Sequence, residues 1–190
     1  KSDPSKETPN LQFHVQPIST DILGASRLHD FDGITPTVAN IRPSSRGEIS
    51  IISNDSRINP KIKMNYLSTQ DDRIVAAQGL KLVRKIMLET KTFKRYEPEE
   101  YRPGVHITDD EELVKAGSEF TQTIFHPVGT CKMGKDDNAV VNDKLYAHGL
   151  KNLRVIDASI MPNITSGNTN APTIMIAEKG AEFILNNQTQ

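Results

Sequence analysis

The sequence predicts an α+β fold in which an antiparallel sheet is flanked by helices. Three observations favour this class. Apolar and polar residues alternate over residues 11–15, which is the pattern of a half-buried strand. Turn-forming residues separate two further strand-like segments, so these segments are expected to pair as a hairpin. A helix with a broad apolar face follows over residues 75–87, and such a face packs on a sheet.

The strands are predicted from their alternation and from the turns between them. The first strand covers residues 11–15. Residues 37–42 and 47–53 form the predicted hairpin, because the segment 43–47 contains Pro, two Ser and Gly. Residues 59–66 are expected to be extended and to end in a turn.

The first predicted helix has a clear start signal. Ser68 or Thr69 is expected to cap it, because a hydroxyl oxygen can accept a bond from an N–H of the first turn. Asp71 and Asp72 would lie in that turn, where carboxylates complement the helix dipole.

The second predicted helix begins at the capping-box pattern Thr108-Asp109-Asp110-Glu111. Its apolar face would comprise Leu113, Gly117, Phe120 and Ile124. The helix is expected to run directly into residues 125–126, so that its C-terminal end positions His126.

A short strand and a final helix are predicted near the C-terminus. Residues 153–156 are rich in β-branched side chains, and this predicted strand ends at Asp157. Asn170 is expected to cap the last helix, with Pro172 in its first turn. The apolar stripe of this helix would comprise Ile174, Ala177, Ala181 and Leu185.

Length and composition exclude several functional classes. The chain has 190 residues, a formal net charge of -1, 36% hydrophobic residues and a mean hydropathy of -0.48. It is long enough for a hydrophobic core, and it has no basic stripe that would predict binding to nucleic acid. No apolar run approaches the roughly 18 residues of a membrane span. No metal site is predicted.

Two stretches of the sequence have a composition that is typical of a functional site. Residues 125–134 and 157–172 contain few bulky apolar side chains and many Gly, Pro, Asn and Thr residues, which favour shaped backbone over a packed core. His126 is the strong acid–base candidate in them, because an imidazole titrates near neutral pH. The alternative is a histidine that hydrogen-bonds loop backbone.

The same two stretches carry a family resemblance. His-Pro-Val-Gly-Thr-Cys-x-Met-Gly begins at His126, and Asn-Leu-Arg-Val-x-Asp-Ala-Ser-x-Met-Pro begins at Asn152. Gly-Asn-Thr-Asn-Ala-Pro-Thr and Ile-Ala-Glu-Lys follow in order. Together they resemble the C-terminal signatures of the glucose–methanol–choline (GMC) family of FAD-dependent alcohol oxidoreductases.

The resemblance implies a two-domain organisation. Residues 1–150 would be the substrate-binding domain with the catalytic loop, and residues 151–190 would return to an FAD-binding domain of Rossmann type. The Gly-x-Gly fingerprint of that domain is absent from the sequence, so the chain looks like the C-terminal third of a larger enzyme. It is expected to be inactive without the N-terminal FAD-binding domain.

The catalytic residues implied by the resemblance are His126 and Asn168. His126 matches the base that removes the hydroxyl proton while hydride passes to flavin N5. Asn168 matches the partner position, where an amide can donate a hydrogen bond to the substrate oxygen but cannot share proton transfer at neutral pH.

The resemblance also implies contacts with FAD. Asp157 and Ala158 match backbone contacts to the ribityl and phosphate portion. Thr169 and Asn170 match backbone N–H groups near the flavin C2 carbonyl, which agrees with the positive end of a helix starting there. The alternative for the run 168–170 is ordinary loop and capping chemistry.

The predicted function is therefore that of an FAD-dependent dehydrogenase or oxidase acting on the CH–OH group of a small alcohol. A second interpretation is a non-catalytic remnant that acts as a binding or interaction module. The presence of both His126 and Asn168 counts against that second interpretation.

Overall fold

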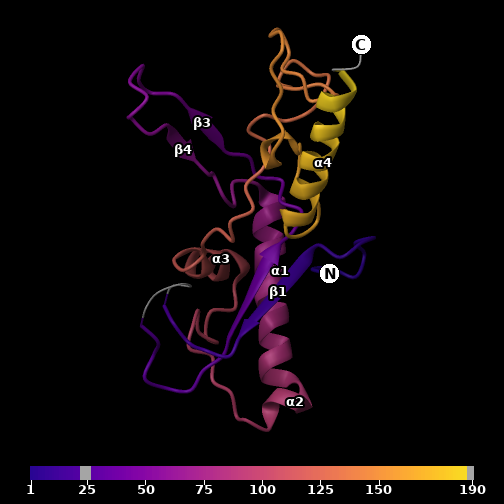
Figure 1. Ribbon diagram of the computed structural model, residues 1–190. Helices are drawn as coiled ribbons and strands as arrows, with labels where there is room; N and C mark the ends of the chain where they lie inside the picture. The colour runs from indigo at the N-terminus through magenta and orange to yellow at the C-terminus, as the bar shows by residue number, and fades with distance from the viewer. Residues whose placement is uncertain (22–26, 188–190) are drawn as a thin grey trace. The chain divides into compact units, whose positions relative to one another are not determined.

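Helices and two small antiparallel sheets make up the computed structural model, which describes residues 1–21 and 27–187 (Figure 1). This confirms the predicted α+β class. Contacts separate the chain into unit 1, residues 1–46 and 66–122, and unit 2, residues 47–65 and 123–190. The predicted division at residue 150 concerns family domains and stays a prediction. Within the described residues, no helix has the length and apolar character needed to cross a bilayer.

The sheet of unit 1 consists of β1 (Leu11–Gln16) and β2 (Thr35–Asn40), which run antiparallel with Leu11 opposite Asn40. Both strands were predicted, but the predicted pairing of the second with residues 47–53 is wrong. In that region β3 (Glu48–Ser50) pairs instead with β4 (Lys61–Lys63). The turn residues between β2 and β3 do not close a hairpin, because their N–H groups bind a carboxylate on the next helix.

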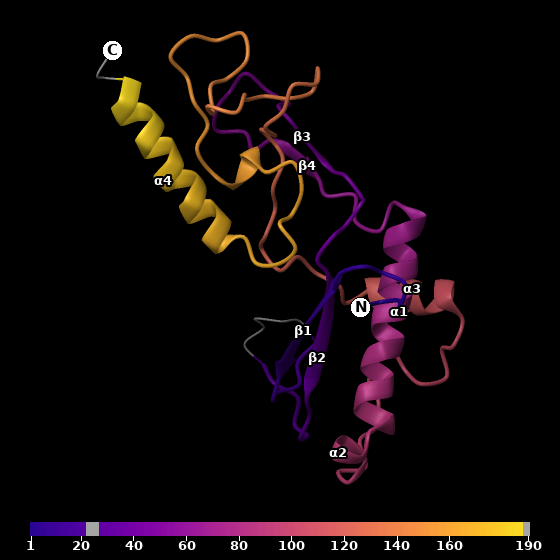
Figure 2. The ribbon, with the colours of Figure 1, turned by 90° about the vertical axis from the view of Figure 1, so that its right-hand side faces the viewer.

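Helix α1 (Gln70–Arg84) covers this sheet. Thr69 is its N-cap, and the Thr69 side chain accepts a bond from the N–H of Asp72, which confirms the predicted start. A methyl group on Gly79 would lie 3.1 Å from Cγ2 of Val38 in β2, so the helix and the strand are in close contact. Figure 2 shows α1 alongside β1 and β2. The chain continues as the π-helical turn η1 (Lys85–Glu89) and the short helix α2 (Lys91–Lys94).

Helix α3 (Asp110–Ser118) is shorter than predicted. Asp109 is its N-cap and accepts bonds from two N–H groups of the first turn, each at 3.0 Å. The helix does not run into residues 125–126, because the N–H of Phe120 and the hydroxyl of Thr121 both donate to the carbonyl of Gly117 and close its last turn. Contacts other than this helix therefore position His126.

Asp72 is a buried carboxylate that holds the segment after β2 against the start of α1. It is 3% exposed and accepts bonds from the N–H of Ser44 at 2.9 Å and the N–H of Ser45 at 2.8 Å. Burial raises the pKa of this carboxyl, but the bonds donated by Ser45 and Ser44 outweigh it, so the pKa lies below its ordinary value. The sequence predicted only an interaction with the helix dipole.

The same segment is bonded to the residues that precede α1. The Ser45 hydroxyl oxygen accepts bonds from the N–H of Ser68 at 3.0 Å and the N–H of Thr69 at 3.3 Å. The hydroxyls of Ser44 and Thr69 lie 2.7 Å apart. We call this group, comprising Ser44, Ser45, Ser68, Thr69 and Asp72, the serine clasp.

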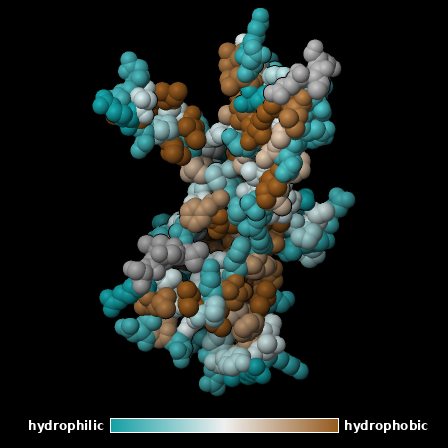
Figure 3. Space-filling model, in the orientation of Figure 1, coloured by the Kyte–Doolittle hydropathy of each residue, from teal (hydrophilic) through white to brown (hydrophobic). Residues whose placement is uncertain are grey.

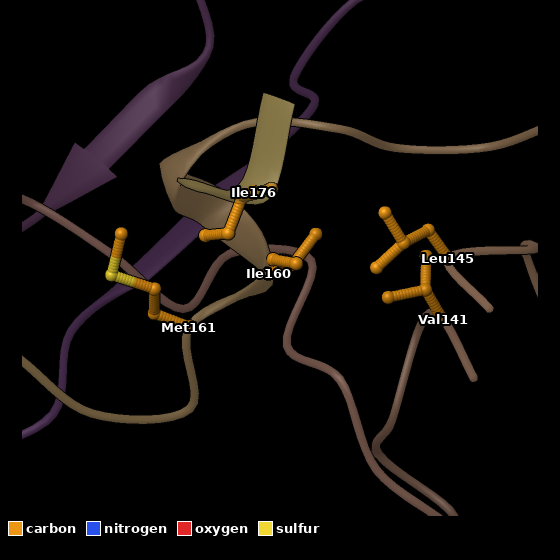
Figure 4. Close-up of a cluster of buried hydrophobic side chains, with 5 residues drawn as sticks. All are labelled: Val141, Leu145, Ile160, Met161 and Ile176. Atoms are coloured by element: carbon orange, nitrogen blue, oxygen red, sulfur yellow. The ribbon is translucent and has the colours of Figure 1, made fainter. Parts of the chain in front are cut away.

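Unit 2 contains the β3–β4 hairpin, the 3₁₀ turn η2 (Ala158–Ile160) and the helix α4 (Asn170–Asn187). Its core is a small apolar cluster, shown in Figure 4. The members are Val141, Leu145, Ile160, Met161 and Ile176, each no more than 7% exposed. Only Ile176 comes from a long helix, so irregular backbone contributes most of this core.

Residues 153–156 do not form the predicted strand. Arg154 makes a single antiparallel bridge with Tyr146. Beside it, the N–H of Ala147 donates to Leu153 and the N–H of Val155 donates to Leu145. The β-branched run thus pairs only with a short irregular segment of the loop, and one bridge is too little to make a strand.

Helix α4 begins one residue earlier than predicted. Asn170 is its first helical residue, so it is not the cap. The carbonyl of Thr169 accepts the first helical bond, from the N–H of Thr173 at 3.0 Å. Thr169 therefore occupies the position from which the helix starts.

The two sides of α4 differ in burial. The predicted apolar stripe is exposed, with Ile174 at 54% and Leu185 at 64% exposure. Figure 3 shows apolar side chains at the surface in the region of α4 and on the β3–β4 hairpin. The packed side passes through Ile176 and Gly180, and a methyl group on Gly180 would lie 2.4 Å from Cγ2 of Ile156.

Candidate active site

Two loop stretches far apart in the sequence are bonded to each other in unit 2. The N–H of Cys131 donates to the carbonyl of Ser159 at 3.0 Å, and the N–H of Met133 donates to the carbonyl of Ile160 at 2.8 Å. Gly129 has a φ of 89°, and a methyl group there would lie 3.3 Å from the carbonyl oxygen of Met161. The stretches 125–134 and 157–172 are thus joined to each other through their backbones.

The backbone immediately before His126 is strained. Phe125 has a φ of 64°, in the left-handed region that few bulky residues adopt. Its N–H donates to the Thr123 hydroxyl at 3.1 Å, and its side chain is 76% exposed. Such backbone conformations concentrate at functional sites.

The half-buried imidazole of His126 has a partner at each ring nitrogen. The side-chain amide nitrogen of Asn168 lies 2.8 Å from Nε2. The hydroxyl oxygen of Thr169 lies 2.9 Å from Nδ1, and the N–H of Thr169 donates to the same nitrogen at 3.3 Å. The structure therefore brings the two predicted catalytic residues together, and it adds Thr169 as a third member.

The start of α4 lies next to this group. In any α-helix the first N–H groups have no acceptor within the helix, and here these belong to Asn170 and Ala171, since Pro172 has no N–H. They form the positive end of the helix dipole. This end of α4 is suited to an electron-rich oxygen of a cofactor or substrate.

Asp157 and Ala158 lie at the neighbouring η2 turn and are not joined to His126 by a hydrogen bond. Asp157 is extended, and its carboxylate accepts a bond from the N–H of Ser159 at 2.8 Å. Ala158 is the first residue of η2. This turn is the segment that binds the backbone of residues 131–133. The structure thus divides the predicted residues into a group at His126 and a group at η2.

The hydroxyl of Thr169 is the contact that sequence reasoning missed. Thr169 was predicted only as a source of a backbone N–H. The sequence offered one signal for this contact: Thr169 has a hydroxyl group and directly follows Asn168, the candidate partner of the base. Nothing local in the sequence shows that this hydroxyl reaches a histidine 43 positions earlier.

A family model, described as GMC oxidoreductase, matches residues 43–177. The chain therefore belongs to the GMC oxidoreductase family, which confirms the predicted family. An alcohol dehydrogenase [acceptor] of Pseudomonas putida is 43% identical over 185 residues, covering 97% of this chain and 33% of that protein. An oxygen-dependent choline dehydrogenase of Proteus mirabilis (strain HI4320) is 44% identical over 176 residues, covering 93% of this chain and 31% of that protein. The chain thus spans about a third of the length of these relatives.

Solved structures show the same fold. Pyridoxine 4-oxidase from Mesorbium loti superposes with a TM-score of 0.83 at 28% identity, over 96% of this chain and 36% of that protein. A formate oxidase variant from Aspergillus oryzae RIB40, made to study FAD modification, superposes with a TM-score of 0.86 at 28% identity, over 96% of this chain and 32% of that protein.

Proposed function

We propose that this chain is the C-terminal part of an FAD-dependent oxidoreductase that oxidises the CH–OH group of a small alcohol, with His126 as the base and Asn168 as its partner. The observation that carries the proposal is the position of the His126 ring between Asn168 and Thr169 at the start of α4. The similarity to an alcohol dehydrogenase and a choline dehydrogenase supports the substrate class.

His126 takes the hydroxyl proton of the alcohol in this proposal. A neutral imidazole accepts a proton through its unprotonated nitrogen, and an alcohol beside Asn168 would face Nε2. As the proton leaves, negative charge develops on the alcohol oxygen. The amide of Asn168 donates a hydrogen bond to that oxygen and lowers the energy of the charged state. Because an amide does not titrate near neutral pH, the proton stays on His126.

FAD is the proposed cofactor, and when bound it supplies the hydride acceptor at flavin N5. The backbone N–H groups of Thr169 and Asn170 would contact the flavin C2 carbonyl, and Asp157 and Ala158 would contact the ribityl and phosphate portion. The donor set fits, because the first turn of α4 offers N–H groups and a positive dipole end.

The remaining part of the enzyme would lie N-terminal to this chain. The relatives are about three times as long, and the FAD-binding domain implied by the family is expected in that part. The exposed apolar stripe of α4 supports this arrangement, because a face of that kind packs on a sheet. The contact between Asn168 and His126 counts against a non-catalytic remnant.

The test replaces His126 in the whole enzyme, meaning this chain together with its N-terminal part. In His126→Ala we expect flavin reduction by the alcohol to slow by about 10² to 10⁴, the usual contribution of a general base. Stopped-flow absorbance measures the rate, and the FAD content should be unchanged. His106→Ala, which alters an exposed histidine of unit 1, is the matched control. Reduction of His126→Ala at the wild-type rate would overturn the proposal.

A further inference from the structure

We propose that Thr169 is a positioning residue that holds His126 in the tautomer a base requires. This inference rests on the function of His126 proposed above. Thr169 is 7% exposed, and its hydroxyl oxygen lies 2.9 Å from Nδ1 of His126. A hydrogen bond at Nδ1 influences which ring nitrogen carries the single proton of the neutral imidazole.

The two shortest contacts of the ring agree with one tautomer. If the proton is on Nδ1, the Nδ1–H group donates to the Thr169 hydroxyl oxygen at 2.9 Å. Nε2 then keeps its lone pair and accepts a bond from the Asn168 amide nitrogen at 2.8 Å. In this tautomer the hydroxyl of an alcohol can replace the Asn168 amide at Nε2 and give its proton to the same lone pair.

The third contact favours the opposite tautomer. The N–H of Thr169 points at Nδ1 at 3.3 Å, and a fixed donor there favours a lone pair on Nδ1 and the proton on Nε2. That ring could not accept a proton at Nε2, and Asn168 would have to present its oxygen instead of its nitrogen. The Thr169 hydroxyl can either donate to Nδ1 or accept from it, and in this proposal it accepts, because that arrangement lets the Asn168 amide nitrogen donate to Nε2 and keeps the lone pair of a base there.

The hydroxyl also serves the ring after proton transfer. An imidazolium donates from both nitrogens, so its Nδ1–H still needs an acceptor. The Thr169 oxygen already occupies that position. At Nδ1 the charged ring is therefore stabilised without movement of the Thr169 hydroxyl.

The start of α4 fixes the direction of the Thr169 side chain. Its carbonyl accepts bonds from the N–H of Thr173 at 3.0 Å and from the Thr173 hydroxyl at 2.6 Å. A β-branched side chain has few rotamers once its backbone is fixed. Thr169 therefore connects the His126 ring to a helix of 18 residues.

The test compares Thr169→Val with Thr169→Ser in the whole enzyme. Valine keeps the shape and the backbone N–H but removes the hydroxyl, so the remaining contact favours the proton on Nε2. We expect the limiting rate of flavin reduction to fall by about 10- to 100-fold, which corresponds to one lost buried hydrogen bond. The dissociation constant of the alcohol and the FAD content should change little. Serine restores most of the rate because it restores the hydroxyl.

Thr121→Val is the matched control. It removes the hydroxyl of a threonine of unit 1 that bonds the backbone carbonyl of Gly117 instead of the ring, and we expect an unchanged rate. Nitrogen NMR of histidine-labelled enzyme gives a readout that does not depend on activity. Nδ1 of His126 should carry the proton in the wild type, and Nε2 should carry it in Thr169→Val. The signal is assigned from its loss in His126→Gln.

The outcomes separate this inference from the function on which it rests. Suppose that flavin reduction is slow in His126→Ala but has the wild-type rate in Thr169→Val, and that the nitrogen NMR spectrum of Thr169→Val is unchanged. Thr169 then has no positioning role, and the proposed role of His126 as the base stands. If His126→Ala is itself fast, the proposed function fails. Should Thr169→Val lose FAD, Thr169→Ala takes its place with the same expected slow rate and the same rescue by Thr169→Ser. A slow Thr169→Ser enzyme with full FAD content would also overturn the inference.

Discussion

The two units of the chain are built in different ways. In unit 1, α1 packs on β1 and β2, and α3 packs on α1 with Leu113 completely buried. In unit 2, loops supply three of the five buried core residues, and the 3₁₀ turn η2 supplies a fourth. Backbone bonds hold the two signature stretches together. Regular elements therefore form the scaffold of unit 1, whereas irregular backbone forms the candidate site of unit 2. Functional residues commonly lie on such loops, where side chains can converge from distant positions.

The units also differ in how their main helix is covered. In unit 1, Val75 and Ala77 of α1 are fully buried, at 2% and 0% exposure. In unit 2, α4 leaves Ile174 and Leu185 more than half exposed. Unit 2 thus has an apolar face that its own residues do not cover. The predictions below test this difference and the loop-based construction of the site.

The largest effect is expected from separating this chain from the rest of the enzyme. The 190-residue chain alone should neither bind FAD nor oxidise an alcohol, because it lacks the fingerprint that anchors the pyrophosphate. The uncovered face of α4 should also favour self-association. Titration with FAD, followed by flavin fluorescence, checks the first expectation. Stoichiometric quenching by a yellow protein that an alcohol can reduce would contradict it.

A smaller effect is expected when the partner of the base is removed. Asn168→Ala should slow flavin reduction by up to about 10²-fold, less than His126→Ala, because it removes one hydrogen bond to the developing alkoxide. Asn168→His should keep part of the activity, because an imidazole can also donate a bond. Pre-steady-state reduction of the two variants measures the difference. Unchanged turnover and unchanged substrate affinity in Asn168→Ala would show that Asn168 has no role in catalysis and only stabilises the loop before α4.

The packing of α4 can be tested at Gly180. Alanine normally stabilises a helix by about 1 kcal/mol relative to glycine. Here the added methyl group would meet three side-chain atoms of Ile156, the nearest at 2.4 Å, and overpacking costs about 1–3 kcal/mol. We therefore expect Gly180→Ala to reduce the hydrogen-exchange protection of α4. Adding Ile156→Ala should restore part of it, and Glu178→Ala on the exposed side is the control. Increased protection in Gly180→Ala would show that Ile156 moves aside freely.

The corresponding test in unit 1 concerns Asp72. Asp72→Asn should lower the free energy of unfolding by about 1–2 kcal/mol near neutral pH, because an NH₂ group replaces one of the two carboxylate oxygens that accept bonds from Ser44 and Ser45. The pKa of Asp72 is lower in the folded protein than in the unfolded chain, so its contribution is present above the unfolded value of about 3.9 and is lost as the pH falls through the folded value. The difference in melting temperature between wild type and variant should therefore shrink below about pH 4. A difference that is constant with pH would rule out an ionised Asp72 in the clasp.

Local signals predicted the elements that local contacts stabilise. The start of α1 was found because the Thr69 hydroxyl caps a residue three positions later. The association of His126 with Asn168 was found only through the family resemblance, since the two residues lie 42 positions apart. The pairing of β2 and the buried contacts of Asp72 were missed, because a carboxylate 28 positions later takes the N–H groups of the expected turn. The predicted strand at residues 153–156 is wrong for a related reason. The β-propensity of a segment does not show whether another strand lies beside it to form a pair.

The serine clasp has a consequence for how the sequence can be changed. The chain leaves unit 1 after residue 46 and re-enters it at residue 66, and Ser45 is bonded directly to Ser68 and Thr69. The ends of the intervening segment are therefore held together by residues outside it. For unit 1, residues 47–65 are therefore an insertion between two joined ends. The entropic cost of closing such a loop grows only with the logarithm of its length. A change in the length of this segment is therefore expected to leave the fold of unit 1 intact.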